Sequence, residues 1–75
     1  MGQTEIIIGL KNLDNMNKGK WYYLKEVILY LKQNNLLASR EKDVSNDLYR
    51  LCLFNMVEIR INGLTNPKRE YRIKQ

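Results

Sequence analysis

The stretch VSNDLYRLCLFNMVEIRI, residues 44–61, decides the fold because its apolar period changes partway along. The first apolar residues recur at the spacing of one helix face, at Val44, Leu48, Leu51 and Cys52. After Asn55, which tolerates the positive φ of a sharp reversal, apolar and charged residues alternate as in a half-buried strand. We therefore predict a helix over about residues 40–54 that leads directly into a β-strand at residues 57–61, with Cys52 and Met56 in the core.

The residues after this stretch predict the second strand of a hairpin. Tyr71 and Ile73 alternate with charged residues near the carboxyl end. Asn62-Gly63 is a strong signal for a two-residue turn, but a tip there would place Pro67 inside the return strand, where proline lacks the N–H that pairs strands. We therefore predict a longer loop over about residues 62–68.

The residues before the stretch predict another helix at the amino end. Ile6, Leu10 and Leu13 repeat at helical spacing, which indicates a helix over about residues 4–15 with Thr4 as its N-cap. The three isoleucines at residues 6–8 also suit a strand, since β-branched residues favour one. The longer helical period decides for the helix.

Three consecutive aromatic residues, Trp21, Tyr22 and Tyr23, favour a short third strand beside the hairpin. A second helix over about residues 24–32 follows them, and Asn34-Asn35 ends it because asparagine adopts the left-handed conformation found at helix ends. Ser39 is a favourable N-cap for the next helix. These elements predict an α+β fold, mainly α, in a single domain spanning residues 1–75.

The composition narrows the setting and the chemistry. With one cysteine and no histidine, the chain has neither a disulfide framework nor a plausible zinc site, so we expect no metal and no cofactor. No apolar run approaches the roughly 20 residues of a membrane span, and the start MGQTE lacks a basic region before an apolar one. We expect a cytoplasmic protein that does not enter a membrane.

The charge is basic and unevenly placed. The net charge is +5, which favours nucleic acid or another anionic partner. Residues 57–75 carry five basic side chains against two acidic ones, whereas residues 39–56 carry three of each. The hairpin is therefore the most basic segment, and the helix at residues 40–54 is neutral.

Residues 44–58 resemble the recognition helix and its exit in the winged helix-turn-helix superfamily. ArsR- and MarR-type bacterial and archaeal regulators commonly read V-S-x-x-L-x-x-L-x-x-x-G-L-V-E there. The residues that match are Val44, Ser45, Leu48, Leu51, Val57 and Glu58. Asn55 replaces the glycine and Met56 the leucine. The resemblance implies three helices with a carboxyl-terminal β-hairpin wing, and a transcriptional regulator of double-stranded DNA.

The geometry of DNA then gives candidate binding residues, because a helix fits the major groove while a hairpin reaches an adjacent backbone or minor groove. On the helix and its start these are Ser39, Arg40, Lys42, Ser45, Asn46 and Tyr49. On the hairpin they are Asn66, Lys68 and Arg69, with Arg60 and Arg72 as further phosphate contacts. Arg40 would read guanine and Asn46 adenine, the pairings that bidentate geometry favours.

Other interpretations of the same residues stay open. The helix face at residues 40–54 could simply be solvated, and lysine and proline protect an edge hairpin from aggregation without any ligand. Glu41, Asp43 and Asp47 would each face phosphate in a docked helix, so they favour a protein-interaction module that has lost DNA binding. The aromatic residues 21–23 belong to the sheet and core or, alternatively, stack on RNA bases.

The remaining residues predict the oligomeric state and the absence of catalysis. A homodimer would raise DNA affinity, and the first helix and Tyr30 are the candidate surfaces for it. Cys52 is expected in the core rather than as a redox sensor, since no cationic residue lies beside it. The chain has no histidine, no phosphate-binding glycine loop and no nucleophile beside a base. We expect neither an enzyme nor a small-molecule ligand.

Overall fold

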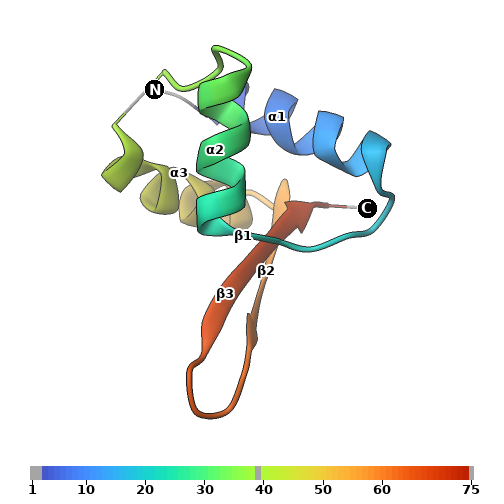
Figure 1. Ribbon diagram of the computed structural model, residues 1–75, viewed down its shortest axis with the longest axis vertical. Helices are drawn as coiled ribbons and strands as arrows, with labels where there is room; N and C mark the ends of the chain where they lie inside the picture. Colours follow the sequence, from blue (N-terminus) through green and yellow to red (C-terminus); the bar gives the residue numbers. More distant parts are fainter. Residues whose placement is uncertain (1–2, 39, 75) are drawn as a thin grey trace.

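A computed structural model describes residues 3–38 and 40–74, which form three helices and a three-stranded antiparallel sheet. In chain order the elements are helix α1 (Gln3–Met16), strand β1 (Tyr22–Tyr23), helix α2 (Leu24–Gln33), helix α3 (Glu41–Leu53), strand β2 (Val57–Asn62) and strand β3 (Lys68–Ile73). The helices gather at one end, and the β2–β3 hairpin projects away from them (Figure 1). This is the predicted α+β class, including the short third strand. In the described segments no helix is long and apolar enough to cross a membrane.

Strand β3 is the middle strand of the sheet, whose order is β1-β3-β2. Tyr22 of β1 lies opposite Tyr71, and Val57 of β2 lies opposite Ile73. The hairpin loop covers residues 63–67, so the prediction of a loop longer than two residues is confirmed. Pro67 ends this loop and stays outside the strand ladder, as its missing N–H requires.

Helices α2 and α3 end in the same way, at an asparagine with positive φ. The φ of Asn35 is 56° and that of Asn55 is 62°, and the next residue returns its N–H to the helix. The Leu36 amide donates to the Leu31 carbonyl at 2.8 Å, and the Met56 amide donates to the Leu51 carbonyl at 2.9 Å. Both are Schellman turns, which satisfy the free carbonyls of the last helical turn. The two predicted helix ends are therefore confirmed.

The helix starts differ from the prediction at two positions. Thr4 already lies inside α1, so it is not the N-cap. Arg40 occupies the N-cap position of α3 with extended backbone, because the helix begins at Glu41. The N-cap is therefore not Ser39, which lies outside the described residues. Helix α2 is stabilised instead by the Glu26 carboxylate, which accepts a 2.9 Å hydrogen bond from the Tyr23 amide.

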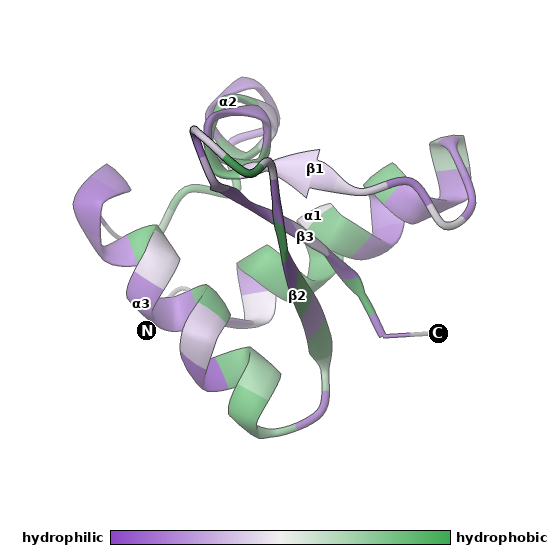
Figure 2. Cartoon of the chain, turned by 90° about the horizontal axis from the view of Figure 1, so that it is seen from below, coloured by the Kyte–Doolittle hydropathy of each residue, from purple (hydrophilic) through white to green (hydrophobic). Residues whose placement is uncertain are grey.

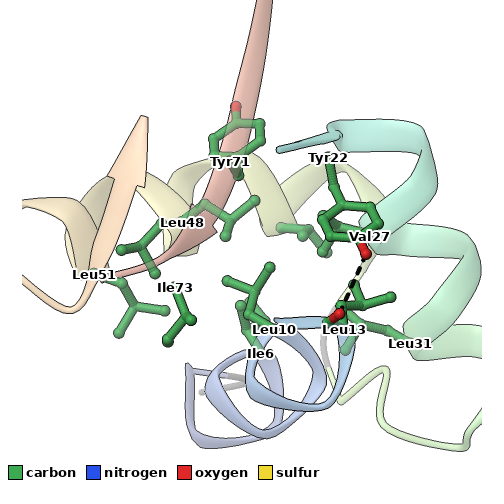
Figure 3. Close-up of a cluster of buried hydrophobic side chains, with 12 residues drawn as sticks. Ile6, Leu10, Leu13, Tyr22, Val27, Leu31, Leu48, Leu51, Tyr71 and Ile73 are labelled. Atoms are coloured by element: carbon green, nitrogen blue, oxygen red, sulfur yellow. Dashed lines mark hydrogen bonds between the residues drawn. The ribbon is translucent and has the colours of Figure 1, made fainter. Parts of the chain in front are cut away.

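The three helices and the sheet meet in one apolar cluster (Figure 3). Its fully buried members include the predicted helix-face residues Val44, Leu48 and Leu51. The Tyr22 hydroxyl enters this cluster and donates a 3.2 Å hydrogen bond to the Leu13 carbonyl, drawn as a dashed line. The burial of that aromatic ring therefore leaves no polar atom of the hydroxyl unsatisfied.

Two residues expected in the core lie outside it. Cys52 is only half-buried, because it sits at the margin of the α3 face that Leu48 and Leu51 define. Met56 is 41% exposed, since the reversal at Asn55 turns its side chain outward before Val57 returns to the core.

Candidate nucleic-acid interface

A groove of about 540 Å³ lies where α2, α3 and the hairpin converge. The first turn of α2 contributes Leu24, Lys25 and Glu26, α3 contributes Ser45, and β1 contributes Tyr23. Strand β3 completes the lining with Lys68, Arg69 and Tyr71. Segments that are far apart in the sequence therefore present their side chains to one concave surface.

Three cations line this groove. Lys25, Lys68 and Arg69 are all exposed, and in residues 3–38 and 40–74 none of them forms an ion pair with an acidic side chain. Lys68 instead places its ammonium 5.7 Å from the centre of the Tyr23 ring, a cation–π distance that holds the side chain over the groove wall. Against the single carboxylate of the lining, Glu26, these three cations leave the groove with a net charge of +2, which is attractive to an anionic ligand.

Tyr71 forms part of the groove floor. Its ring is 2% exposed and packs over the core beside Leu48, and its hydroxyl points away from that cluster (Figure 3). A hydroxyl at the base of a basic groove can donate a hydrogen bond to a phosphate oxygen. The groove thus combines charge with a polar group held by a rigid strand.

The candidate residues on α3 fall into two groups. Ser45 is half-buried and lines the groove. Arg40, Lys42, Asn46 and Tyr49 are exposed on or just before the helix and lie outside the groove lining. The structure therefore brings Ser45, Lys68 and Arg69 together and leaves the remaining α3 residues on the adjoining helix face. Asn66 is exposed in the hairpin loop, also away from the groove.

The acidic residues of α3 do not all face solvent, contrary to the expectation. Asp47 is 5% exposed, because it is three residues from Val44 and four from Leu51 and so shares their buried side. Glu41 forms a 2.9 Å ion pair with Lys32 of α2. Asp43 is half-buried. An anion approaching the outward face of α3 therefore meets less negative charge than the sequence implied.

The arginines of the hairpin strands have intramolecular partners. Arg60 pairs with Glu70 at 2.7 Å and Arg72 pairs with Glu58 at 3.0 Å, in both cases directly across the β2–β3 ladder. The guanidinium carbons of Arg60 and Arg72 lie 4.5 and 4.3 Å from the centre of the Trp21 ring. We call these five residues the Trp21 clamp. It ties the connection before β1 to the outer face of the hairpin.

The contacts in the clamp favour a structural role for Arg60 and Arg72 over contact with phosphate. Arg72 also donates a 3.0 Å hydrogen bond to the Gly19 carbonyl, so its guanidinium is committed on several sides. Glu70 is 6% exposed, which makes its pair with Arg60 part of the packed structure. Arg60 and Arg72 are therefore structural groups, whereas Lys68 and Arg69 remain available to a ligand.

Sequence reasoning missed Lys25, Tyr23 and Tyr71 as groove residues. They come from the start of α2, from β1 and from the middle strand, and only the packing of these elements brings them together. The one signal in the sequence was the position of Lys25 in the first turn of a predicted helix, next to residues assigned to the sheet.

Comparison with protein-family models, with characterised proteins and with solved structures finds no significant match. In the parts of the chain that the structure describes, no group of three or more His, Cys, Asp or Glu side chains is placed to hold a metal ion.

Proposed function

We propose that this chain is a winged helix-turn-helix protein that binds double-stranded DNA and acts as a transcriptional regulator. In this proposal the amino-terminal half of α3 enters the major groove, and the β2–β3 hairpin is the wing. The observation that carries it is the basic groove, where Lys25, Lys68 and Arg69 have no carboxylate partner in the described chain.

The order of elements supports the proposal. The winged helix-turn-helix resemblance implies three helices followed by a hairpin, with a short strand after the first helix. The chain has this succession, with α1, β1, α2, α3, β2 and β3 in sequence and the strand order β1-β3-β2. The hairpin begins just after α3 ends and projects away from the helices (Figure 1), so it would contact a backbone next to the groove that the helix enters.

The chemistry of the groove supports phosphate as its ligand. Ammonium and guanidinium groups at Lys25, Lys68 and Arg69 would neutralise phosphates and release condensed counterions. The hydroxyls of Ser45 and Tyr71 would add neutral donors. These contacts position a duplex without reading its sequence.

Base reading would come from the exposed amino end of α3. Arg40 would donate two hydrogen bonds to guanine, and Asn46 would pair with adenine. Lys42 shares this outward side of the helix and would contact the flanking backbone. Affinity in this scheme depends mainly on the groove and wing, and selectivity depends on α3.

Two rival functions have less support. The protein-interaction module without DNA binding relied on three exposed acids on α3, yet Asp47 is buried and Glu41 is paired with Lys32. Binding of single-stranded or structured RNA relied on the aromatic residues 21–23, yet the Trp21 ring already contacts two guanidinium groups of the hairpin. Of these three aromatic residues only Tyr23 is exposed, and its ring lies beside the Lys68 ammonium.

The salt dependence of duplex binding tests the proposal. If Lys25, Lys42, Lys68 and Arg69 each contact one phosphate, the slope of log affinity against log salt is about −3.6. Affinity should then fall about 150-fold between roughly 50 and 200 mM salt. Lys68→Ala should make the slope less steep by about 0.9 and weaken all sequences alike.

The matched control is Lys11→Ala, which removes the same charge from an exposed position on α1. It should leave the slope unchanged. Arg40→Ala should change the sequence preference instead. Absence of duplex binding at about 50 mM salt, or equal effects of Lys11→Ala and Lys68→Ala on the slope, would refute the proposal.

A further inference from the structure

The outward face of α3 changes character along its length. One stripe of side chains runs along the side of α3 opposite the core. It consists of residues 42, 46, 49 and 53, which share a helix face because they are three or four positions apart. The first two, Lys42 and Asn46, are polar. The last two, Tyr49 and Leu53, are 56% and 65% exposed. Contact with phosphate explains the polar half of this stripe, but it does not explain the exposed apolar side chains at its end.

Two further exposed apolar side chains follow the end of this stripe along the chain. Phe54, directly after the helix, is 69% exposed, and Met56, beyond the turn at Asn55, is 41% exposed. We call Tyr49, Leu53, Phe54 and Met56 the α3-end patch. In Figure 2 the last turn of α3, where the chain leaves the helix for β2, has the colour of hydrophobic residues.

The patch is not explained by the core or by the groove. The side chains of α3 that pack inward are Val44, Asp47, Leu48 and Leu51, on the opposite side of the helix. No member of the patch lines the basic groove. Single exposed apolar residues are common on proteins, but large ones that gather at one place mark a surface covered by a partner.

The charges beside the patch are positive. Arg50 lies four residues before Phe54 and so is its neighbour on the helix surface. Lys74 is held beside Met56, because its amide donates a 3.1 Å hydrogen bond to the Met56 carbonyl. Both side chains are exposed, and neither has an ion-pair partner within the described ranges. Residues 49–56 contain no acidic side chain.

These charges indicate which partner covers the patch, a second copy of this chain or another protein. Two copies of this chain in a two-fold contact would bring the same patch together and would place Arg50 and Lys74 against their own counterparts. The net charge of +5 on each copy adds to that repulsion. A partner that is apolar at its centre and acidic around it would complement both features.

We propose that the α3-end patch binds an acidic, amphipathic helical segment of another protein. Leucine or phenylalanine side chains of that segment would cover Leu53 and Phe54, and its carboxylates would pair with Arg50 and Lys74. Because the patch and the basic groove share no residue, the chain would hold such a partner and an anionic ligand at the same time. The proposal does not depend on DNA being the ligand of the groove.

Selection from a displayed library of random peptides, each about 16 residues long and so able to form several helical turns, tests this with the full chain as bait. The enriched peptides should carry Asp or Glu together with Leu or Phe at helical spacing. Their affinity should fall by about tenfold or more for the double variant Leu53→Ser/Phe54→Ser and for Arg50→Glu.

The matched control is Leu29→Ser/Leu64→Ser, which removes two leucines that are 55% and 103% exposed but lie outside the patch. It should bind the selected peptides as the unmodified chain does, and circular dichroism should show that all variants keep their helices. No enrichment over the Leu53→Ser/Phe54→Ser bait, or enrichment of neutral or basic peptides, would overturn the proposal. Dimerisation in sedimentation that only Leu53→Ser/Phe54→Ser abolishes would also overturn it, because a second copy would then be the occupant.

Discussion

Replacing Trp21 with alanine tests the largest structural feature outside the apolar core. The guanidinium carbons of both Arg60 and Arg72 lie against the ring, 4.5 and 4.3 Å from its centre. These arginines are paired with Glu70 and Glu58 across the hairpin. Without the ring, the two guanidinium groups lose their apolar support, and the connection before β1 is no longer packed against the hairpin.

The cost can be worked out from these contacts. Each cation–π contact at a partly exposed site contributes about 0.5–1 kcal/mol. Returning about 100 Å² of ring surface to water adds about 2.5 kcal/mol, an upper value because the unfolded chain already covers some of it. Better hydration of the freed guanidinium groups offsets part of this loss. We expect Trp21→Ala to lower the free energy of unfolding by about 2–3 kcal/mol and the Tm by about 10–20 °C.

Urea unfolding followed by circular dichroism measures this loss for Trp21→Ala. Trp21→Phe keeps an aromatic ring against the arginines and should cost about 1 kcal/mol. Because Trp21 is the only tryptophan in the chain, its fluorescence in the unmodified protein reports directly on opening of the clamp. A loss below about 1 kcal/mol for alanine, or equal losses for alanine and phenylalanine, would refute the reasoning.

Three smaller changes probe single features of the fold through the free energy of unfolding. Tyr22→Phe removes the buried 3.2 Å hydrogen bond to the Leu13 carbonyl and should cost about 1 kcal/mol in urea unfolding; a neutral result would mean that the bond contributes nothing net. Gly63→Ala places a side chain at φ +100° and a Cβ 2.8 Å from the Asn66 carbonyl oxygen, so thermal unfolding should show a loss of about 1–2 kcal/mol. Asn55→Ala should cost about 1 kcal/mol at φ 62°, whereas Asn55→Gly should be neutral or stabilising; the reverse order in thermal melts would contradict the left-handed turn.

Those features that depend on local chemistry could be predicted from the sequence. Asn35 and Asn55 end their helices because positive φ is tolerated by asparagine, a property of the residue itself. Pro67 excluded the short turn through its missing N–H. The period of Val44, Leu48 and Leu51 placed the buried face of α3 correctly.

Burial of charge could not be predicted, since it depends on partners elsewhere in the chain. Asp47 has the spacing of the buried α3 face, but a carboxylate there was expected to face water. Glu70 is buried because β3 is the middle strand and because Arg60, which lies against the Trp21 ring, pairs with it. The alternation of residues in a strand gives the face of a side chain but not what covers that face.

The candidate site was predictable only in part for a similar reason. Lys68 and Arg69 were found because the hairpin is the most basic segment of the chain. Lys25 was not, because its place in the groove results from packing the start of α2 against β3 and α3. Arg60 and Arg72 looked equally available until the strand register placed a glutamate opposite each of them.

The most direct test of the central claim, that the basic groove and the amino end of α3 bind duplex DNA, is amide chemical-shift mapping during a DNA titration at low salt. The account predicts that the largest shifts occur at Lys25, Ser45, Lys68 and Arg69, with further shifts at Asn46 and little change along α1. Absence of shifts on adding duplex, or shifts confined to the α3-end patch, would contradict it.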